Sequence, residues 1–507
     1  MTENTKEPVT KIPSVTDASA QRAKSEKTVK GGAWAWILAS FALVALLTVA
    51  IIINQNHTGS NTSSEVVSTM DIDNGDLKIN WNRYTTYDVQ LTQTYTITTP
   101  GIYHFTGTLD DGAIIVKVSS EDAVKIILDN VTIKNSSGPA IACLTGDDLV
   151  IELVGENTLS DSASYSADYD EDVDGAIYSK ADLTFQGDGS LSLTANYQDG
   201  IVSKDDLKFI SGTYNISAAD DAIRGKDSVY IVDGTFDVTA REDAIKSTNY
   251  STAGKGFILI ENGDLTIAAG DDAIHAETIL MIQDGKVAVS KSYEGLEAPK
   301  IIINGGDVSV AANDDGINAG SSSDNTATTA SKVGGMVDSN SNCEIIVNGG
   351  NVYVNAAGDG IDSNGYIYFN GGIVTVDGPT NNGNGALDAG ISIAINGGTV
   401  ITVGSSGMAE TLGATSAINN ISVYFTSAQK AGTAIVVKNS AGETVLEHTS
   451  AKAFNHMAAG TEEFVLGETY TIYINGSEYQ SFTIGGVTTT IGNTNSNYNT
   501  SGGQMRR

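Results

Sequence analysis

A repeat of about 22 residues runs through the middle of this 507-residue chain. Its clearest mark is an acidic residue followed by Ala or Gly and then by an aliphatic residue. The copies begin at Asp199, Asp221, Asp243, Asp272, Glu294, Asp315 and Asp359. Their spacings are 22, 22, 29, 22, 21 and 44 residues, and the last equals two periods joined by a polar insertion. So short a period restricts the chain to a few repeat architectures.

Each repeat also contains short stretches of alternating apolar and polar residues that are bounded by Gly, Asn or Asp. Examples are Gly212–Ile216, Gly234–Val238 and the apolar run Phe257–Ile260. Three such stretches in about 22 residues predict three strands and leave no room for a helix. Leucine-rich repeats need a consensus that is missing here, and a propeller blade needs roughly 40 residues. The repeat therefore predicts an all-β fold, a parallel β-helix with three strands per coil.

The repeat and the segments that flank it predict the domain organisation. The β-helix is expected over 71–405, with residues 71–118 forming the first coils and a cover for the N-terminal edge. Residues 406–490 lose the repeat and predict a small antiparallel β unit, either a separate sandwich or a cap on the solenoid. Residues 491–507 are predicted to be a polar tail.

The N-terminal region contains a candidate membrane anchor. Ala33–Ile53 is 21 residues long and carries no charge, which suffices to cross ~30 Å of hydrocarbon as a helix. Arg22, Lys24, Lys27 and Lys30 lie shortly before this segment, and no Lys or Arg follows it until Lys78. The positive-inside rule predicts a cytoplasmic tail over 1–32, a transmembrane signal anchor over 33–53, a linker over 54–70 and an extracellular remainder, a single-pass plasma-membrane topology. A cleaved signal peptide is the alternative.

Composition excludes several classes of protein. The formal net charge is −33, and no basic cluster suited to phosphate is present, so nucleic acid is not an expected partner. Two cysteines, Cys143 and Cys343, are too few for a disulfide scaffold or a Cys-based zinc site. Serine-hydrolase, P-loop and zincin motifs do not occur. We expect a folded, acidic monomer.

Winding the repeat into coils predicts a column of carboxylates, because equivalent positions of neighbouring coils lie ~4.8 Å apart. Adjacent bare charges at that spacing repel by roughly 3.5 kcal/mol at an effective dielectric of about 20. Calcium relieves such repulsion with six to eight oxygen ligands. The column supplies Asp199, Asp220, Asp221, Glu242, Asp243, Asp271, Asp272, Asp314 and Asp315 as candidate Ca²⁺ ligands. Solvated acids that cap turns are the alternative interpretation.

An acidic loop before the column adds three more candidate ligands. Asp170, Asp172 and Asp174 match the first half of an EF-hand loop. The Glu that an EF-hand needs at the twelfth position is replaced by Ala181, so the loop is not an EF-hand. We expect it to bind calcium locally.

Basic residues follow the column on three consecutive repeats. If Ile223, Ile245 and Ile274 point inward, alternation along a strand directs Arg224, Lys246 and His275 outward. A basic stripe beside bound Ca²⁺ suits the carboxylate of an acidic sugar, so these three residues are candidate carbohydrate ligands. The alternative is that they pair with the neighbouring aspartates.

These motifs resemble a family of bacterial carbohydrate-binding proteins with a pectate-lyase-like, right-handed parallel β-helix. The resemblance covers about 71–490 and depends on Leu128–Ile133, on Val154–Leu159, on Asp174–Ile177 and on the repeated Asp-Asp-Ala-Ile turns. It implies calcium in the acidic turns and binding of cellulose-like chains or polygalacturonate, without established catalysis. It does not imply the membrane anchor.

Three functions remain open from the sequence. The leading hypothesis is a cell-surface, calcium-dependent protein that binds acidic or plant-cell-wall polysaccharide. The second is a calcium-dependent polygalacturonate lyase that works by β-elimination, with Lys246 as the base because a Lys pKa can be lowered. The third is a structural or adhesion protein of the cell surface that binds no glycan.

Overall fold

The computed structural model describes residues 66–320 and 339–492. The chain divides into two units, Met1–Thr69 and Met70–Arg507, and the second contains the repeats. The predicted cytoplasmic tail and anchor, and most of the predicted linker and polar tail, lie outside the described residues. In those two described stretches, no helix is long and apolar enough to cross a membrane.

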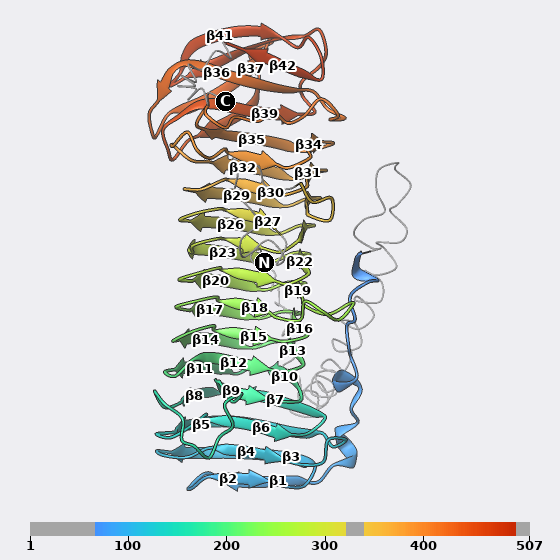
Figure 1. The fold of residues 1–507 in the computed structure, drawn as a ribbon, viewed down its shortest axis with the longest axis vertical. Coiled ribbons are helices and arrows are strands. Elements are labelled where there is room, and N and C mark those ends of the chain that lie inside the picture. Colours follow the sequence, from blue (N-terminus) through green and yellow to red (C-terminus); the bar gives the residue numbers. More distant parts are fainter. Residues whose placement is uncertain (1–65, 321–338, 493–507) are drawn as a thin grey trace, which may run out of the picture. The chain divides into compact units, whose positions relative to one another are not determined.

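The regular secondary structure described in the second unit consists almost entirely of β-strands, and the predicted all-β class is confirmed (Figure 1). Two short 3-10 helices, η1 (Asp76–Lys78) and η2 (Trp81–Arg83), precede the first strand. Most strands pair in parallel with strands one repeat away, and they form three stacks that we call ladders I, II and III.

Ladder I is a sheet of twelve short parallel strands. Its strands are β2 (Tyr95–Ile97), β4 (Ile114–Lys117), β6 (Ile141–Thr145), β9 (Gly175–Ser179), β12 (Asp199–Ser203), β15 (Ile223–Gly225), β18 (Ile245–Ser247), β21 (Ile274–Ala276), β24 (Leu296–Glu297), β27 (Ile317–Ala319), β30 (Ile361–Ser363) and β33 (Leu387–Ala389).

Ladder II begins with three strands of the first coils and continues to the end of the repeats. Its strands are β1 (Thr86–Gln90), β3 (Gly101–Leu109), β5 (Val124–Lys134), β7 (Asp148–Val154), β10 (Asp182–Gly187), β13 (Asp206–Phe209), β16 (Ser228–Ile231), β19 (Phe257–Ile260), β22 (Ile279–Ile282), β25 (Lys300–Ile303), β28 (Glu344–Val347), β31 (Tyr366–Phe369) and β34 (Ser392–Ile395).

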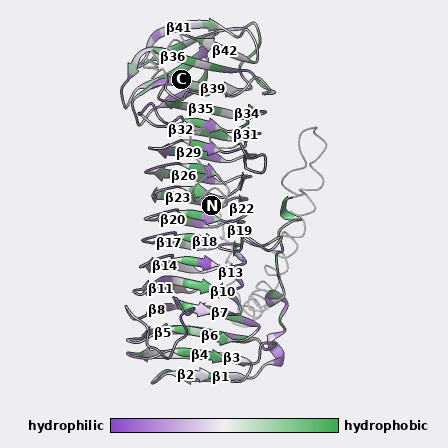
Figure 2. Ribbon diagram, viewed as in Figure 1, coloured by the Kyte–Doolittle hydropathy of each residue, from purple (hydrophilic) through white to green (hydrophobic). Residues whose placement is uncertain are grey.

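Ladder III starts where the second half of β5 pairs with β8. Its strands are β8 (Glu156–Ser160), β11 (Ser190–Ala195), β14 (Thr213–Ala218), β17 (Thr235–Thr239), β20 (Asp264–Ala268), β23 (Lys286–Lys291), β26 (Asp307–Ala312), β29 (Asn351–Ala356), β32 (Ile373–Asp377) and β35 (Thr399–Gly404). Purple and green alternate along many of these strands, as expected when one face of a strand is buried (Figure 2).

The core lies between the ladders and is built from equivalent residues of successive coils. In ladder I, Ile223 pairs with Ile245, and Ile245 pairs with Ile274. All three side chains are fully buried, so they point inward as predicted. Because alternation reverses the direction of the next side chain, Arg224, Lys246 and His275 face outward.

Turn glycines allow the coils to stack closely. Gly306 has a φ of +83°, a conformation that favours glycine. A Cβ atom there would lie 2.5 Å from the carbonyl oxygen of Gly285, the equivalent glycine of the preceding coil. A larger residue at this position would therefore force the two coils apart.

The strands that follow β35, which we call the C-terminal unit, continue directly from ladder III. β39 (Phe454–Thr461) pairs antiparallel with β35, and β36 (Asn420–Gln429) lies between β39 and β42 (Thr488–Ile491). A four-stranded antiparallel sheet covers it, made of β37 (Ala434–Asn439), β38 (Thr444–Thr449), β40 (Thr469–Ile474) and β41 (Ser477–Thr483). This pairing favours the cap over the separate sandwich, because it satisfies the free edge of β35.

The N-terminal segment does not cover the edge that we expected it to cover. Asp76 of η1 forms an ion pair with Lys208 of β13, whose strand lies several coils from the edge strand β1. The segment therefore lies along the outer face of ladder II. Its position is set by a charge pair between residues 132 positions apart, which no local pattern reveals.

Candidate functional site

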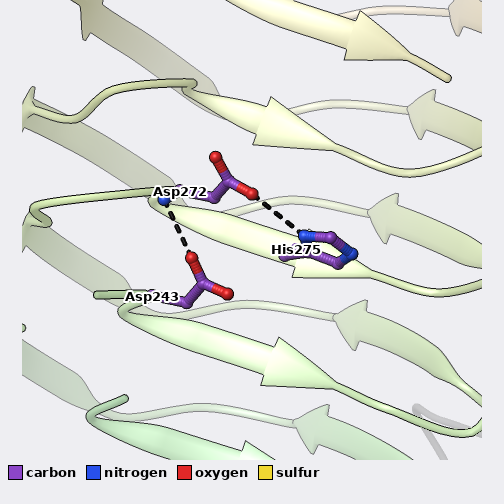
Figure 3. Close-up of side chains that lie close together, drawn as sticks. All are labelled: Asp243, Asp272 and His275. Atoms are coloured by element: carbon purple, nitrogen blue, oxygen red, sulfur yellow. Dashed lines mark hydrogen bonds and ion pairs between the residues drawn. The ribbon is translucent and has the colours of Figure 1, made fainter. Parts of the chain in front are cut away.

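Aspartates at the entrance to ladder I lie one above another. The backbone N–H of Asp221 donates to Asp199 Oδ1 at 3.2 Å, and that of Asp243 donates to Asp221 Oδ1 at 3.1 Å. The next step repeats the contact, from Asp272 N to Asp243 Oδ1 at 2.9 Å (Figure 3). One oxygen of each carboxylate thus binds the turn of the next coil, and the other is left for a second partner.

At the start of the acidic column, basic residues of ladder I supply that second partner. Arg224 Nε lies 2.7 Å from Asp199 Oδ2, and Arg224 Nη2 lies 2.6 Å from Asp174 Oδ2. Lys246 Nζ lies 2.6 Å from Asp243 Oδ2. The structure therefore favours the alternative in which these cations pair with the acidic column.

This pairing disfavours Lys246 as a catalytic base. Burial alone would lower the pKa of Lys246, but the charges of Asp243 and Asp221 raise it above its usual value. A general base near neutral pH must give up its proton readily. Lys246 stays protonated, so it lacks the property that a β-elimination mechanism requires.

His275 is the last cation of the stripe. Its Nδ1 lies 2.9 Å from Asp272 Oδ2 and 2.9 Å from Glu297 Oε2. Burial alone would lower the pKa of His275, but these two hydrogen bonds raise it to about 10. His275 therefore carries a positive charge at neutral pH and offsets the carboxylates on both sides.

Beyond Glu297 the same register contains no cation. Glu297 pairs with Asn318, Asn318 with Asp362, and Asp362 with Asp388. Carboxylate oxygens of Asp315, Asp359 and Asp362 lie within 4.8 Å of one another. We call these three residues the acidic cluster; among the described residues, no Lys, Arg or His forms an ion pair with them.

The acidic cluster cannot hold all of its charge without a counter-ion. Burial, followed by repulsion from neighbouring carboxylates, raises the pKa of Asp362 to about 8. Burial likewise raises the pKa of Asp315 and that of Asp359 to about 7. Arg224, Lys246 and His275 lie beside the earlier part of the column, whereas the coils of the acidic cluster contribute no basic residue to this register.

Several other candidate ligands lie outside such groups. Lys180 Nζ lies 3.8 Å from Asp170 Oδ2 and 3.2 Å from Asp172 Oδ2, while Asp174 contacts Lys204 and Arg224. Each of these three aspartates thus has a basic residue of the protein as a partner, and calcium binding by the loop stays a prediction. The first acids of the repeated pairs, Asp220, Glu242, Asp271 and Asp314, belong to none of the close carboxylate groups of the described residues.

Sequence reasoning placed Asp359 in the acidic column without selecting it as a ligand, and it missed three other acids in or near the cluster. Asp359 is the only acid before the Gly of its repeat, and Asp362 is at an outward-facing position of its strand. Both are weaker signals for a ligand than a pair of adjacent acids. Asp388 follows Gly385-Ala386-Leu387, a copy of the repeat without its acidic residue. Glu410 lies beyond the repeats, and burial, with repulsion from Asp388 and Asp359, raises its pKa to about 7.

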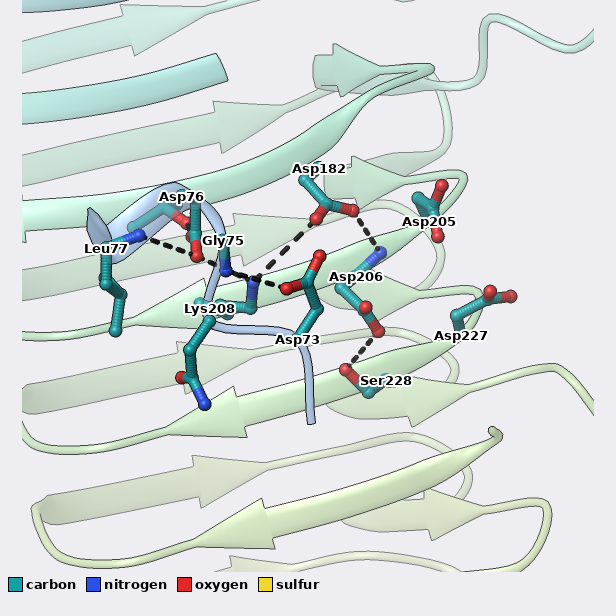
Figure 4. A network of polar contacts seen from close by, with 12 residues as sticks. Asp73, Gly75, Asp76, Leu77, Asp182, Asp205, Asp206, Lys208, Asp227 and Ser228 are labelled. Atoms are coloured by element: carbon teal, nitrogen blue, oxygen red, sulfur yellow. Dashed lines mark hydrogen bonds and ion pairs between the residues drawn. The ribbon is translucent and has the colours of Figure 1, made fainter. Parts of the chain in front are cut away.

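A second group of acids that lie close together is paired with lysines of the protein. Asp182, Asp205 and Asp206 lie close together on the outer face of ladder II (Figure 4). Lys208 Nζ lies 3.8 Å from Asp182, and Lys255 Nζ lies 3.1 Å from Asp206. Lysines thus offset the charges of Asp182 and Asp206. Lys208 and Lys255 also form ion pairs with Asp76 and Asp71 of the N-terminal segment.

Comparison with known proteins gives consistent matches. A family model described as "Carbohydrate-binding domain-containing protein" matches residues 92–338. A protein of the same description from Acetivibrio thermocellus is 41% identical over 198 residues, which are 38% of this chain and 69% of that protein. This chain belongs to the family of carbohydrate-binding domain-containing proteins.

A solved structure is also similar to this family member. It is the polysaccharide lyase-like protein from C. thermocellum, as a gadolinium derivative, with 32% sequence identity and a TM-score of 0.39. The match covers 40% of this chain and 89% of the other.

Proposed function

We propose that this chain binds acidic polysaccharide, such as polygalacturonate, with calcium held by the acidic cluster. The observation that supports the proposal is a set of three half-buried carboxylates without a partner cation among the described residues. Family membership supports a carbohydrate as the partner. In this proposal the solenoid is a right-handed β-helix with three strands per coil, as in pectate lyases.

The donor set of the acidic cluster fits calcium. Ca²⁺ takes oxygen ligands at ~2.3–2.6 Å. Three oxygens within 4.8 Å of one another lie close enough for one ion to contact them all after small rotations of the side chains. Asp388 and Glu294 lie near enough to raise the pKa of Asp362 by repulsion, and they would add negative charge around the ion. Calcium would supply the positive charge that attracts a sugar carboxylate.

Arg224, Lys246 and His275 take a different role in this proposal from the one that the sequence suggested. Their charges are already offset by the acidic column, so they hold the coils in register. The attraction for an acidic sugar then comes from the metal ion, which makes binding dependent on calcium.

We also propose that the protein acts at the cell surface, anchored through Ala33–Ile53. The charge asymmetry around that segment supports this topology. Protease added to intact cells should remove the repeats from the anchored chain; complete protection in intact cells would contradict the proposal.

We expect the full-length protein to bind polygalacturonate in calcium and not in EDTA. Asp362→Asn should weaken calcium binding about tenfold or more, ~1.4 kcal/mol, because it removes one anionic ligand. Isothermal titration calorimetry, first with calcium and then with polygalacturonate, measures both steps. The matched control is Glu242→Gln, an exposed acid of the same column on a coil with its own cation, which should leave both unchanged.

A further inference from the structure

A groove lies on the outer face of ladder III, on the side of the C-terminal unit. Its volume is about 570 Å³, and it is lined by β23, β26, β29 and β32, with β38 contributing His448 and Thr449. Most of its lining residues follow residue 338, where the match to the family model ends.

The groove crosses successive coils. Lys286, Asp307, Asn351 and Ile373 occupy one register position on four neighbouring strands. At ~4.8 Å per coil, this row is about 14 Å long. The groove is thus elongated in the direction of coil stacking, which suits a short polymer chain better than a compact ligand.

An aromatic ring and an aliphatic side chain form the apolar part of the groove. Tyr353 is 36% exposed and Ile373 is 52% exposed, although neighbouring inward residues of the same strands are buried. The hydroxyl of Tyr353 donates to Asp377 Oδ2 at 2.9 Å, which fixes the orientation of the ring. Sugar rings present an apolar C–H face, and a fixed aromatic side chain offers a matching surface at a low cost in entropy.

The buried carboxylate of Asp377 connects residues of the groove through hydrogen bonds. It is 1% exposed and accepts hydrogen bonds from His448 Nε2 at 2.8 Å and from Ser450 Oγ at 2.9 Å. Burial alone would raise the pKa of Asp377, but its hydrogen bonds, first that from His448, lower it. Because Asp377 is on β32 and His448 is on β38, one ionised carboxylate holds Tyr353 and His448 in place across two structural elements.

The basic residues that line the groove already have partners. Lys286 Nζ lies 2.9 Å from Asp264 Oδ1, and His448 contacts Asp377. Asn351 Nδ2 donates to Asp307 Oδ1 at 2.7 Å, and the carboxylate of Asp307 has a second oxygen that can accept from a ligand. A carboxylated sugar would find no unpaired cation among these lining residues, whereas the hydroxyls of an uncharged sugar find carboxylate, amide and hydroxyl groups.

We propose that this groove binds a neutral oligosaccharide and does so without calcium. It shares with the proposed function only the ligand class, because none of its residues belongs to the acidic cluster. The two sites are therefore separable: chelation should abolish binding of polygalacturonate and leave binding of a neutral oligosaccharide intact.

The test is calorimetric titration of the full-length protein, in EDTA, with cellohexaose, xylohexaose and mannohexaose. We expect at least one to bind, and Tyr353→Ala to weaken it about tenfold or more by removing the apolar platform. Tyr353→Phe keeps the ring and should retain most of the affinity. Tyr250→Ala, at a tyrosine that is 75% exposed on another part of the solenoid, should leave binding unchanged.

Two results would overturn the proposal. One is that none of the three hexasaccharides binds at millimolar concentration. The other is that Tyr353→Ala and Asp307→Ala, with melting temperatures like that of the unmodified chain, both bind as well as it does. Loss of calcium-dependent polygalacturonate binding alone would contradict the proposed function and not this groove.

Discussion

Calcium is expected to raise the melting temperature of this protein strongly at pH 8 and little at pH 5. At pH 8 Asp315 and Asp359 are largely ionised and Asp362 is about half ionised, so these carboxylates repel one another and an ion that binds only the folded state stabilises it. At pH 5 they are protonated in the folded chain, since the pKa is raised to about 8 for Asp362 and to about 7 for Asp315. Calorimetry with calcium and with EDTA at both pH values measures the difference.

The same groups predict the pH dependence without calcium. The folded pKa of each lies above its unfolded value near 4, so the folded state binds more protons over the interval between them. Their contribution is therefore fully present below about pH 4 and is lost as pH rises through 7 to 8. A tenfold change in a group's acidity between the unfolded and folded chain corresponds to ~1.4 kcal/mol, so we expect a loss of roughly 3 kcal/mol or more from pH 5 to pH 8 in EDTA.

Asp362→Asn tests whether the response of the melting temperature to calcium comes from the acidic cluster or from the net charge of the whole protein. With one repelling charge removed, the variant should melt at a higher temperature than the unmodified protein at pH 8 in EDTA. It should also gain less from calcium. A variant that keeps the full calcium response would contradict the assignment of Asp362 as a ligand, and an unmodified protein that does not respond to calcium would contradict the metal site altogether.

Lys208→Ala is expected to destabilise the protein by about 3–5 kcal/mol, because it leaves a buried carboxylate without its partner. Lys208 Nζ lies 3.0 Å from Asp76 Oδ1, and the side chains are 1% and 0% exposed. Asp76 also accepts a hydrogen bond from the hydroxyl of Thr184. It accepts another from the backbone N–H of Leu77 (Figure 4). Urea denaturation measures the loss, and limited proteolysis after Arg83 should show that the N-terminal segment detaches.

Two further variants test whether the loss of stability in Lys208→Ala comes from the buried ion pair. Lys286→Ala removes a lysine whose ion pair with Asp264 is about half exposed on both sides, so we expect a loss of at most ~1 kcal/mol. The double variant Asp76→Leu, Lys208→Met removes both buried charges and should recover much of the stability lost in Lys208→Ala. If the single variant is no less stable than Lys286→Ala, the N-terminal segment is not held by this pair.

The sequence predicted the elements that depend on local periodicity. An aliphatic residue recurring about every 22 positions, as at Ile223, Ile245 and Ile274, can be buried on every coil only if the coils stack. The all-β class and the inward direction of these side chains follow from that pattern. The outward direction of Arg224, Lys246 and His275 follows from alternation along a strand.

The partners of outward-facing charges could not be predicted in the same way. Arg224 contacts Asp174, 50 residues earlier in the chain, because side chains reach across coils. The sequence alone could not say that Arg224, Lys246 and His275 offset the first part of the column. Nor could it say that, among the residues the structure describes, no cation pairs with Asp315, Asp359 or Asp362. Similarly, the groove of Tyr353 and His448 forms where Asp377 of β32 contacts His448 of β38, which lies 71 positions later in the chain.

The sequence by itself therefore determined the strands, their repeat and the side on which each residue lies. The reason is that backbone pairing and burial recur at the same spacing as the sequence repeat. Only the tertiary structure decided which carboxylates are neutralised, where the N-terminal segment lies and where an aromatic ring remains exposed. The physical reason is that Coulomb interactions and packing depend on distances in space. In a solenoid, those distances are short between residues that are tens or more than a hundred positions apart in the chain.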